Sequence, residues 1–294
     1  LIVQKNEFLK TFVILESDVD EYSKLIKFIS VLDKEIKKFG HEELIELFEF
    51  VISPSDRIIN GAIYTPSNIR EFIVKQTFNS KKEKIATSKV ADISCGCGGF
   101  ICNAAKEIKK QTKKTYFEIF KNQIFGLDIQ QYSITRTKLL LTLLALCEGE
   151  DRKEFQFNLF TGDALDFNWQ KALNNFSGFD IVLGNPPYVC SRHLSEETKT
   201  KLRTWTVCKS GHPDLYIPFF QIGIENLSNN GILGFITMNS FFKSLNGRSL
   251  REYFQTNSLE FKIIDFGTEQ IFKSRYTYTC ICFIKNRKEG SIKY

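Results

Sequence analysis

The chain has 294 residues and a formal net charge of +6 at pH 7, and 43% of its residues are hydrophobic against 25% charged. These proportions are typical of a soluble globular protein and exclude a collagen, a disordered tail and a small disulfide-stabilised scaffold. The length predicts two domains, or one large domain with an appendage, and allows a core that needs neither disulfides nor a metal.

The first part of the chain, residues 1–53, is predicted to be helical. Asp18 followed by Glu21 resembles a capping box, and apolar residues then recur at helical spacing. A second amphipathic run ends before Pro54. We find no carboxylate–lysine cluster of the nuclease type here. We therefore interpret residues 1–53 as a helical packing or linker region and residues 54–294 as the second domain.

Beyond this region, short apolar runs alternate with segments of helical length. The expected strands are Val90–Ser94, Ile124–Ile129, Phe155–Phe160, Phe179–Leu183, Ile232–Met238, Phe261–Phe266 and Tyr278–Lys285. Between most of them lie expected helices at 68–78, 100–110, 130–147, 214–228 and 241–255. Such alternation predicts an α/β fold with a mostly parallel sheet and helices on both faces. Because few residues separate the last two strands, we expect an antiparallel end strand.

The first expected strand runs into a glycine-rich turn that starts at Cys95 and contains Gly96 and Gly98. Glycines let the backbone turn tightly and approach a ligand, and ligands of open α/β sheets bind at the carboxyl ends of strands. The spacing lacks the third glycine of the dinucleotide fingerprint. Asp92, just before the turn, favours a cationic ligand, such as an ammonium group or the sulfonium of S-adenosylmethionine. The alternative is a structural turn with Asp92 as its cap.

Two further acids follow the next two strands. Asp128 stands where a ribose diol would be held, and Asp163 could accept a hydrogen bond from an adenine amine. Each alone is more often a surface turn residue. Three acids at three consecutive strand ends indicate one binding site.

The fourth expected strand runs directly into Asn185-Pro186-Pro187-Tyr188. The prolines fix the backbone and remove donors, and the side-chain oxygen of Asn185 is an acceptor. This oxygen and a nearby backbone carbonyl can accept both hydrogens of a planar NH2 group, which makes its nitrogen able to attack an activated methyl group. Tyr188 offers a ring face to a planar base, a contact of about 1–3 kcal/mol in nucleic-acid stacking. The alternative is a proline-rich turn.

The segment that follows, residues 190–212, is rich in lysine and arginine. We interpret it as a mobile basic loop over the site, suited to phosphate contacts, in preference to a solvated loop.

Several features point away from metals and membranes. The eight cysteines and three histidines show no ligand spacing, so we expect no metal. No apolar run approaches the ~18 residues of a membrane helix, and we recognise no signal peptide. We therefore expect reduced thiols and a cytoplasmic protein. Because the first residue is Leu1 rather than Met, we expect a fragment of a longer protein.

Together these motifs resemble those of the S-adenosylmethionine-dependent DNA adenine-N6 methyltransferases of restriction–modification systems, of the type I and type IIG kind. The resemblance covers Gly61 to Lys285, about three quarters of the chain. It implies a Rossmann-like class I methyltransferase sheet and S-adenosyl-L-methionine as cofactor. It also implies double-stranded DNA as partner, with methylation of the N6 amine of a flipped-out adenine. The family's target-recognition domain would be absent or truncated here, or carried by a separate specificity subunit.

The resemblance also assigns residues to the site. Gly61 to Pro66 resembles an extra cofactor motif in which a helix N-terminus meets the cofactor carboxylate. The implied cofactor-binding residues are Tyr64, Thr65, Pro66, Asp92, Ser94, Cys95, Gly96, Gly98, Asp128, Ile129, Asp163, Ala164, Asn185 and Phe219. The implied catalytic residues are Asn185, Pro186, Pro187, Tyr188 and Phe272, with Phe272 facing Tyr188 across the target base. For Phe219 and Phe272, core packing is an equally good interpretation in a chain with 28 phenylalanines.

Two other functions stay open. Asn-Pro-Pro-Tyr also occurs in methyltransferases that act on a protein glutamine or on ribosomal RNA. A glutamine enzyme is not expected to carry the Tyr64–Pro66 element or the aromatic ring of Phe272. The second is a non-catalytic DNA-binding subunit with a degenerate site, against which the intact Asp92, Gly96 and Asn185 argue.

Overall fold

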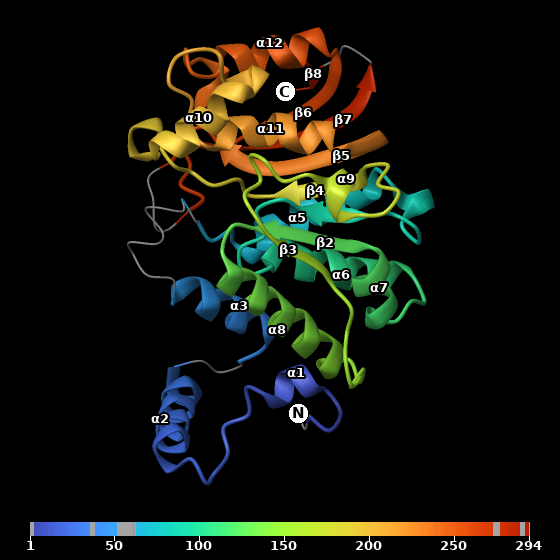
Figure 1. Cartoon of the computed structure of the whole chain (residues 1–294), viewed down its shortest axis with the longest axis vertical. Coiled ribbons are helices and arrows are strands. Elements are labelled where there is room, and N and C mark those ends of the chain that lie inside the picture. Colours follow the sequence, from blue (N-terminus) through green and yellow to red (C-terminus); the bar gives the residue numbers. More distant parts are fainter. Residues whose placement is uncertain are drawn as a thin grey trace.

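A computed structural model describes residues 3–35, 39–51, 61, 63–272, 277–288 and 292–293. Its main body is an eight-stranded sheet with helices on both faces (Figure 1). The strands are β1 (Val90–Asp92), β2 (Ile124–Asp128), β3 (Asn158–Thr161), β4 (Phe179–Gly184), β5 (Leu227–Met238), β6 (Leu259–Asp265), β7 (Thr279–Lys288) and β8 (Ile292–Lys293). The described helices are α1 (Glu7–Lys10), α2 (Val19–Glu35), α3 (His41–Phe50), α5 (Ser67–Asn79), α6 (Gly99–Gln111), α7 (Tyr116–Asn122), α8 (Gln131–Cys147), α9 (Trp169–Ala172), α10 (Glu196–Thr204), α11 (Tyr216–Glu225) and α12 (Arg248–Thr256).

The strands lie in the order β3-β2-β1-β4-β5-β7-β6-β8. Strands β1 to β5 pair in parallel with one another, and β8 pairs in parallel with β6, whereas β7 pairs antiparallel with both β5 and β6. The mostly parallel sheet and its antiparallel strand are therefore confirmed. The connection from β5 to β6 passes through α12 and leaves room for one strand between them. The short connection after β6 then brings β7 into this position, where it runs antiparallel to both neighbours.

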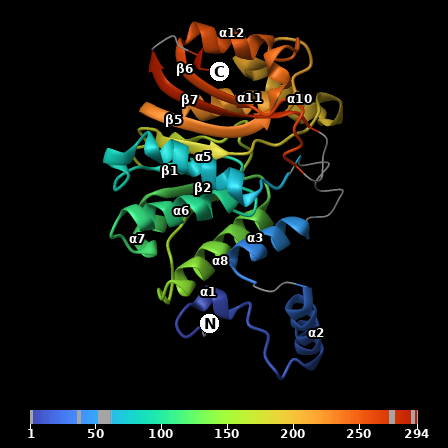
Figure 2. The ribbon, with the colours of Figure 1, turned by 180° about the vertical axis from the view of Figure 1, so that it is seen from behind.

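Helices cover both faces of the sheet because successive side chains of a strand point to opposite sides. On β5, a Cβ at Gly234 would contact Thr77 of α5, whereas Leu233 and Phe235 lie against Gly223 of α11. Accordingly α11 lies in front of the strands in Figure 1, and α5 and α6 lie in front in the reverse view of Figure 2.

Phenylalanines fill much of the interior, as the composition led us to expect. Phe78, Phe120, Phe179, Phe220 and Phe235 are completely buried. All of these except Phe78 form edge-to-face or tilted pairs with neighbouring rings, geometries that add to the free energy gained from burying their surface.

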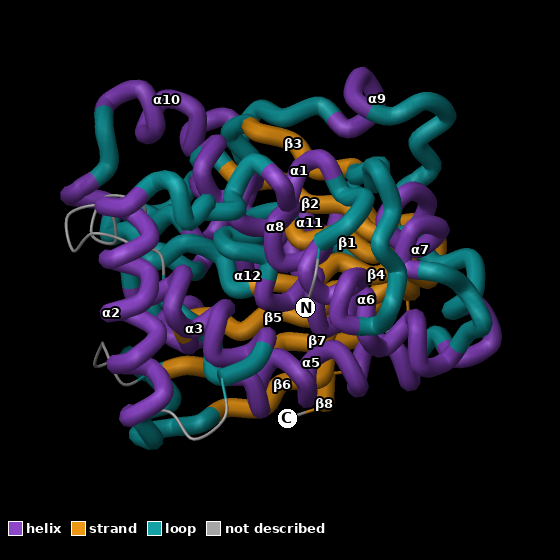
Figure 3. Tube along the Cα trace, turned by 90° about the horizontal axis from the view of Figure 1, so that it is seen from below, coloured by secondary structure: helices purple, strands orange, loops and turns teal. Residues whose placement is uncertain are grey.

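The predicted helical N-terminal region consists of α1, α2 and α3. Helix α3 packs on α8 and buries Ile45 in the main core. Helix α2 lies apart from the sheet, beyond α3 and α8 in Figure 1 and at one side of the molecule in Figure 3, and it exposes Ile26, Phe28 and Ile29. The predicted boundary at residues 53 and 54 lies outside the described residues, so the domain division remains a prediction.

Some boundaries differ from those we predicted. Strand β1 ends at Asp92 because the Asp92 carboxylate accepts a hydrogen bond from Ser94 N and turns the chain. The predicted helix 241–255 begins only at Arg248, since residues Asn239–Phe242 form a separate 3-10 turn. Within the described part of the chain, no helix is both long enough and apolar enough to span a bilayer.

Candidate active site

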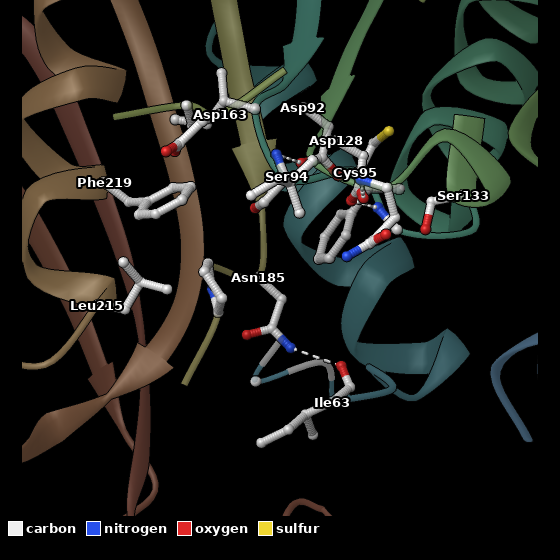
Figure 4. A pocket seen from close by; sticks show the side chains of 18 of the residues that line it. Ile63, Asp92, Ser94, Cys95, Asp128, Ser133, Asp163, Asn185, Leu215 and Phe219 are labelled. Atoms are coloured by element: carbon white, nitrogen blue, oxygen red, sulfur yellow. Dashed lines mark hydrogen bonds between the residues drawn. The ribbon is translucent and has the colours of Figure 1, made fainter. Parts of the chain in front are cut away.

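A cavity of about 350 Å³ opens where β1, β2, β3 and β4 end (Figure 4). It collects Asp92, Asp128 and Asp163, which follow the first three strands, and Asn185, which follows the fourth. The four strand ends thus meet at one edge of the sheet, where α/β proteins bind their ligands.

Most of the predicted site residues line this cavity. They are Tyr64, Thr65, Asp92, Ser94, Cys95, Gly96, Asp128, Ile129, Asp163, Ala164, Asn185, Pro187 and Phe219. The other predicted residues do not line it: Pro66, Gly98, Pro186, Tyr188 and Phe272.

The glycine-rich turn is fixed by close packing. Gly98 has a φ of +84° and caps α6, and a Cβ there would lie 2.7 Å from Thr137 of α8. Thr137 in turn donates a hydrogen bond to Gly96 O, and Gly96 N donates to Asp128 at 2.9 Å. The turn therefore needs glycine at Gly98, and it links the ends of β1 and β2.

Two of the acids of the cavity, Asp92 and Asp128, are poorly solvated. Burial raises the pKa of Asp92 to about 8, although Ser94 N donates to its carboxylate. Burial also raises the pKa of Asp128, which accepts hydrogen bonds from the N–H groups of Gln130 and Gly96. A bound cation would lower both pKa values, so this end of the cavity is suited to a positively charged ligand.

Asp163 and Phe219 lie together at the other end of the cavity (Figure 4). Asp163 accepts hydrogen bonds from Leu165 N at 3.0 Å and from Lys201 Nζ at 2.7 Å. Phe219 is buried yet contributes to the wall. The pair provides a carboxylate and an aromatic ring, as an adenine site would.

Asn185 is held in one orientation by the chain on the amino side of α5. Its Nδ2 donates to Ile63 O and to Thr65 Oγ1, each at 3.0 Å (Figure 4). Among the described residues, no group donates a hydrogen bond to its buried Oδ1. Because a carbonyl oxygen can only accept, the amide cannot flip, and Oδ1 is left to a ligand.

The rings of Tyr188 and Phe272, which the resemblance places on either side of a target base, contact each other directly. Their centroids are 6.0 Å apart with an interplanar angle of 73°, and both side chains are almost completely buried. An edge-to-face pair leaves no slot for a base, so a base between these rings requires them to separate and become parallel.

The sequence interpretation missed two charged residues that line the cavity. Arg70 is buried in α5, pairs with Glu42 and donates to Thr65 O. Glu49 of α3 accepts a hydrogen bond from the Cys97 N–H, and burial raises its pKa. Each lies on the apolar face of its helix, and a charged residue in that position could have indicated a functional role from the sequence alone.

Our prediction of a mobile loop at residues 190–212 is wrong, because part of this segment forms helix α10. Ser195 caps α10 by accepting a hydrogen bond from Thr198 N, and Glu196 and Glu197 occupy the first turn, where acids favour a helix. Lys201 on α10 forms ion pairs with Asp163 and Asp166, each at 2.7 Å, which tie the helix to the end of β3.

Within the described ranges, no group of three or more histidine, cysteine or acidic side chains is arranged to hold a metal.

Comparison with known proteins identifies relatives of this chain. The sequence model of the Eco57I restriction-modification methylase family matches residues 122–272, just over half of the chain. RM.Eco57I, a type II restriction enzyme and methyltransferase from Escherichia coli, is 28% identical over an alignment of 303 positions that covers 85% of this chain and 30% of that protein.

Two solved structures resemble the fold. The DrdV–DNA complex matches 93% of this chain and 32% of its own, with a TM-score of 0.70 at 14% identity. A Listeria monocytogenes protein, described as a class I S-adenosylmethionine-dependent methyltransferase, matches 94% of this chain and 78% of its own, with a TM-score of 0.62 at 16% identity. The predicted Rossmann-like class I methyltransferase fold is confirmed. The chain spans about a third of RM.Eco57I and of the DrdV chain, so it corresponds to one part of such proteins.

Proposed function

Because the chain belongs to the Eco57I restriction-modification methylase family, we propose that it is the methyltransferase part of a restriction–modification system. Its substrate is the N6 amine of an adenine in double-stranded DNA, and its methyl donor is S-adenosyl-L-methionine. Residues 54–294 form the methyltransferase domain, and residues 1–53 a helical region attached to it. Since the substrate is DNA, we place the protein in the cytoplasm, working with a target-recognition domain or a specificity subunit.

The cavity suits this cofactor. Asp92, Asp128 and Asp163 offer carboxylates to its cationic methionine part, its ribose and its adenine, and Phe219 offers a ring to the adenine. Tyr64 and the other predicted cavity residues complete the cofactor site, and Pro66 and Gly98 fix the backbone on either side of it. When bound, S-adenosylmethionine supplies an electrophilic methyl group.

The observation that carries the proposal is the fixed amide of Asn185. With Nδ2 held by Ile63 and Thr65, Oδ1 accepts one hydrogen of the substrate amine, and the backbone carbonyl of Pro186 accepts the other. These bonds draw the nitrogen lone pair out of conjugation with the ring and make the amine nucleophilic. Pro187 keeps this corner rigid.

The target adenine must leave the DNA helix to reach this corner, because a stacked base is out of reach of a methyl donor. Tyr188 and Phe272 then hold it between their rings. The edge-to-face contact that they make with each other fills this space in the absence of the base. Inserting the base exchanges one aromatic contact for two stacking contacts.

A methyl-transfer assay tests the proposal. The protein is incubated with tritiated S-adenosylmethionine and, separately, duplex DNA, ribosomal RNA and a glutamine-bearing release factor, and labelled nucleosides are identified after digestion. Label in N6-methyladenine of DNA is expected. Label only in RNA, protein or cytosine would overturn the assignment.

The matched variants are Asn185→Ala and Asn79→Ala, the second at an exposed position at the end of α5. Asn185→Ala is expected to lose methyl transfer while binding the cofactor within a few fold of the parent, and Asn79→Ala to retain both. Transfer by Asn185→Ala at the parental rate would contradict the role of its Oδ1.

A further inference from the structure

A second cavity, of about 390 Å³, lies beside the candidate active site. Four basic side chains line it, together with an apolar floor that includes Leu194 and Leu202. The basic residues are Arg192, Lys199, Arg203 and His212. None of the described residues that line it is acidic. A hollow with this lining is suited to an anion.

This basic cavity is separated from the first cavity by the segment that follows Tyr188. Ser191 and Arg192 line the basic cavity, whereas His193 lines the first one, and Leu194 lines both. Since these residues directly continue the chain from Asn185–Tyr188, an anion in the basic cavity lies within a few residues of the base-binding corner.

Helix α10 forms the rest of this partition. Thr198 lines the first cavity, and Lys201 on the same side pairs with Asp163. Lys199 and Arg203 lie on the other side and line the basic cavity. Lys201 is thus engaged beside the first cavity, whereas Lys199 and Arg203 are available to a second ligand.

These cations are accessible and only lightly compensated. Arg192 and Arg203 are exposed, and neither guanidinium forms an ion pair with a described residue. Lys199 pairs with Glu196 at 2.8 Å, but that carboxylate is largely exposed to water. Guanidinium groups in a concave site offer the paired donors that phosphate oxygens accept.

We propose that the basic cavity binds one backbone phosphate of the DNA strand whose adenine is flipped. The inference rests on the proposed function and adds to it the place where the strand is held. Phosphate contacts fix the register of a protein on DNA, and here the contact anchors the strand next to Tyr188, so that the base entering the site is the one beside the bound phosphate.

Salt dependence of DNA binding provides the test. Affinity for a fluorescent duplex is measured at several salt concentrations for the parent, Arg192→Gln, Arg203→Gln and the double variant. Losing one phosphate contact makes the slope of log affinity against log salt shallower by about 0.9. If both arginines hold the same phosphate, the double variant loses about one contact, and each single variant loses at most one. A loss of about two contacts would indicate independent surface charges and overturn the proposal, as would no loss.

Three controls keep the outcomes distinct. Lys171→Gln, at an exposed position on α9, is expected to leave the slope unchanged. Cofactor affinity is expected to be the same in all variants, since neither arginine lines the first cavity. Absence of DNA binding by the parent would overturn the proposed function itself. Weaker binding of duplex RNA alone by the variants would assign the cavity to RNA and contradict the inference.

Discussion

Asp92 gives the protein a pH-dependent stability that one substitution should remove. Burial raises its pKa from 3.8 to about 8 in the folded protein, so between these values the folded state holds a proton that the unfolded chain has released. The contribution of Asp92 to the free energy of unfolding is therefore full below pH 4. It falls by about 1.4 kcal/mol per pH unit as the pH rises towards 8.

The variant Asp92→Asn is neutral in both states and lacks this dependence, while its side-chain oxygen can still accept the hydrogen bond from Ser94 N. Relative to the parent, its free energy of unfolding should rise by about 3 kcal/mol between pH 5 and pH 7. Urea unfolding of the cofactor-free protein, followed by fluorescence at both pH values, measures the difference. Titration of groups that do not interact with Asp92 cancels in this comparison; Asp128, whose charge also raises the pKa of Asp92, does not cancel fully.

A difference between variant and parent that stays the same at pH 5 and pH 7 would refute this reasoning. Asp33→Asn, at an exposed position of α2, serves as the control substitution. Repeating the measurement with S-adenosylmethionine should reduce the pH dependence of the parent, because a bound cation lowers the pKa of Asp92.

Other predictions follow from the geometry of the site. Gly98→Ala forces a Cβ to 2.7 Å from Thr137 at a φ of +84° and should cost several kcal/mol in urea unfolding, whereas Gly149→Ala, at a φ of +83° in open space, should cost only about 1 kcal/mol. Similar losses would contradict the packing argument. Phe272→Leu keeps an apolar side chain but removes the ring, so kcat on DNA should fall at least fivefold with cofactor affinity unchanged; an unchanged kcat would remove Phe272 from base binding. The Glu49 carboxylate lies beside Gly96 in the cavity wall, where it would meet the ammonium group of the cofactor's amino-acid part. Glu49→Gln should therefore weaken S-adenosylmethionine binding about tenfold but leave methylthioadenosine, which lacks the amino-acid part, unaffected; calorimetry that shows equal losses would indicate a purely structural role.

The parts of the site that the sequence could predict are those set by strand ends. Asp92, Asp128 and Asp163 each follow an apolar run, and the carboxyl ends of parallel strands meet at one edge, so periodicity and topology suffice to bring them together. Asn185 could be placed for the same reason. The bond from its Nδ2 to Ile63 O depends on a segment more than a hundred residues away, which no local pattern encodes.

The parts that could not be predicted depend on tertiary packing. Helix α10 buries only Leu202, so its sequence lacks the apolar periodicity of a core helix, although the cap at Ser195 was present. Glu49 and Arg70 lie on the apolar faces of their helices, but their place in the cavity depends on how α3 and α5 pack beside the glycine-rich turn. The same holds for the edge-to-face contact of Phe272, because ring orientation is set by packing rather than by chain order.

The double anchor of Asn185 has a consequence for how such a protein can change. Ile63 and Thr65 accept hydrogen bonds from Asn185 and also line the proposed cofactor cavity. The same segment therefore supports both the site of the methyl donor and the residue that holds the methyl acceptor. Remodelling that wall to admit a bulkier donor would loosen the asparagine at once. A change in the donor that the cavity accepts would therefore require compensating changes around Asn185, whether it arises by evolution or by design.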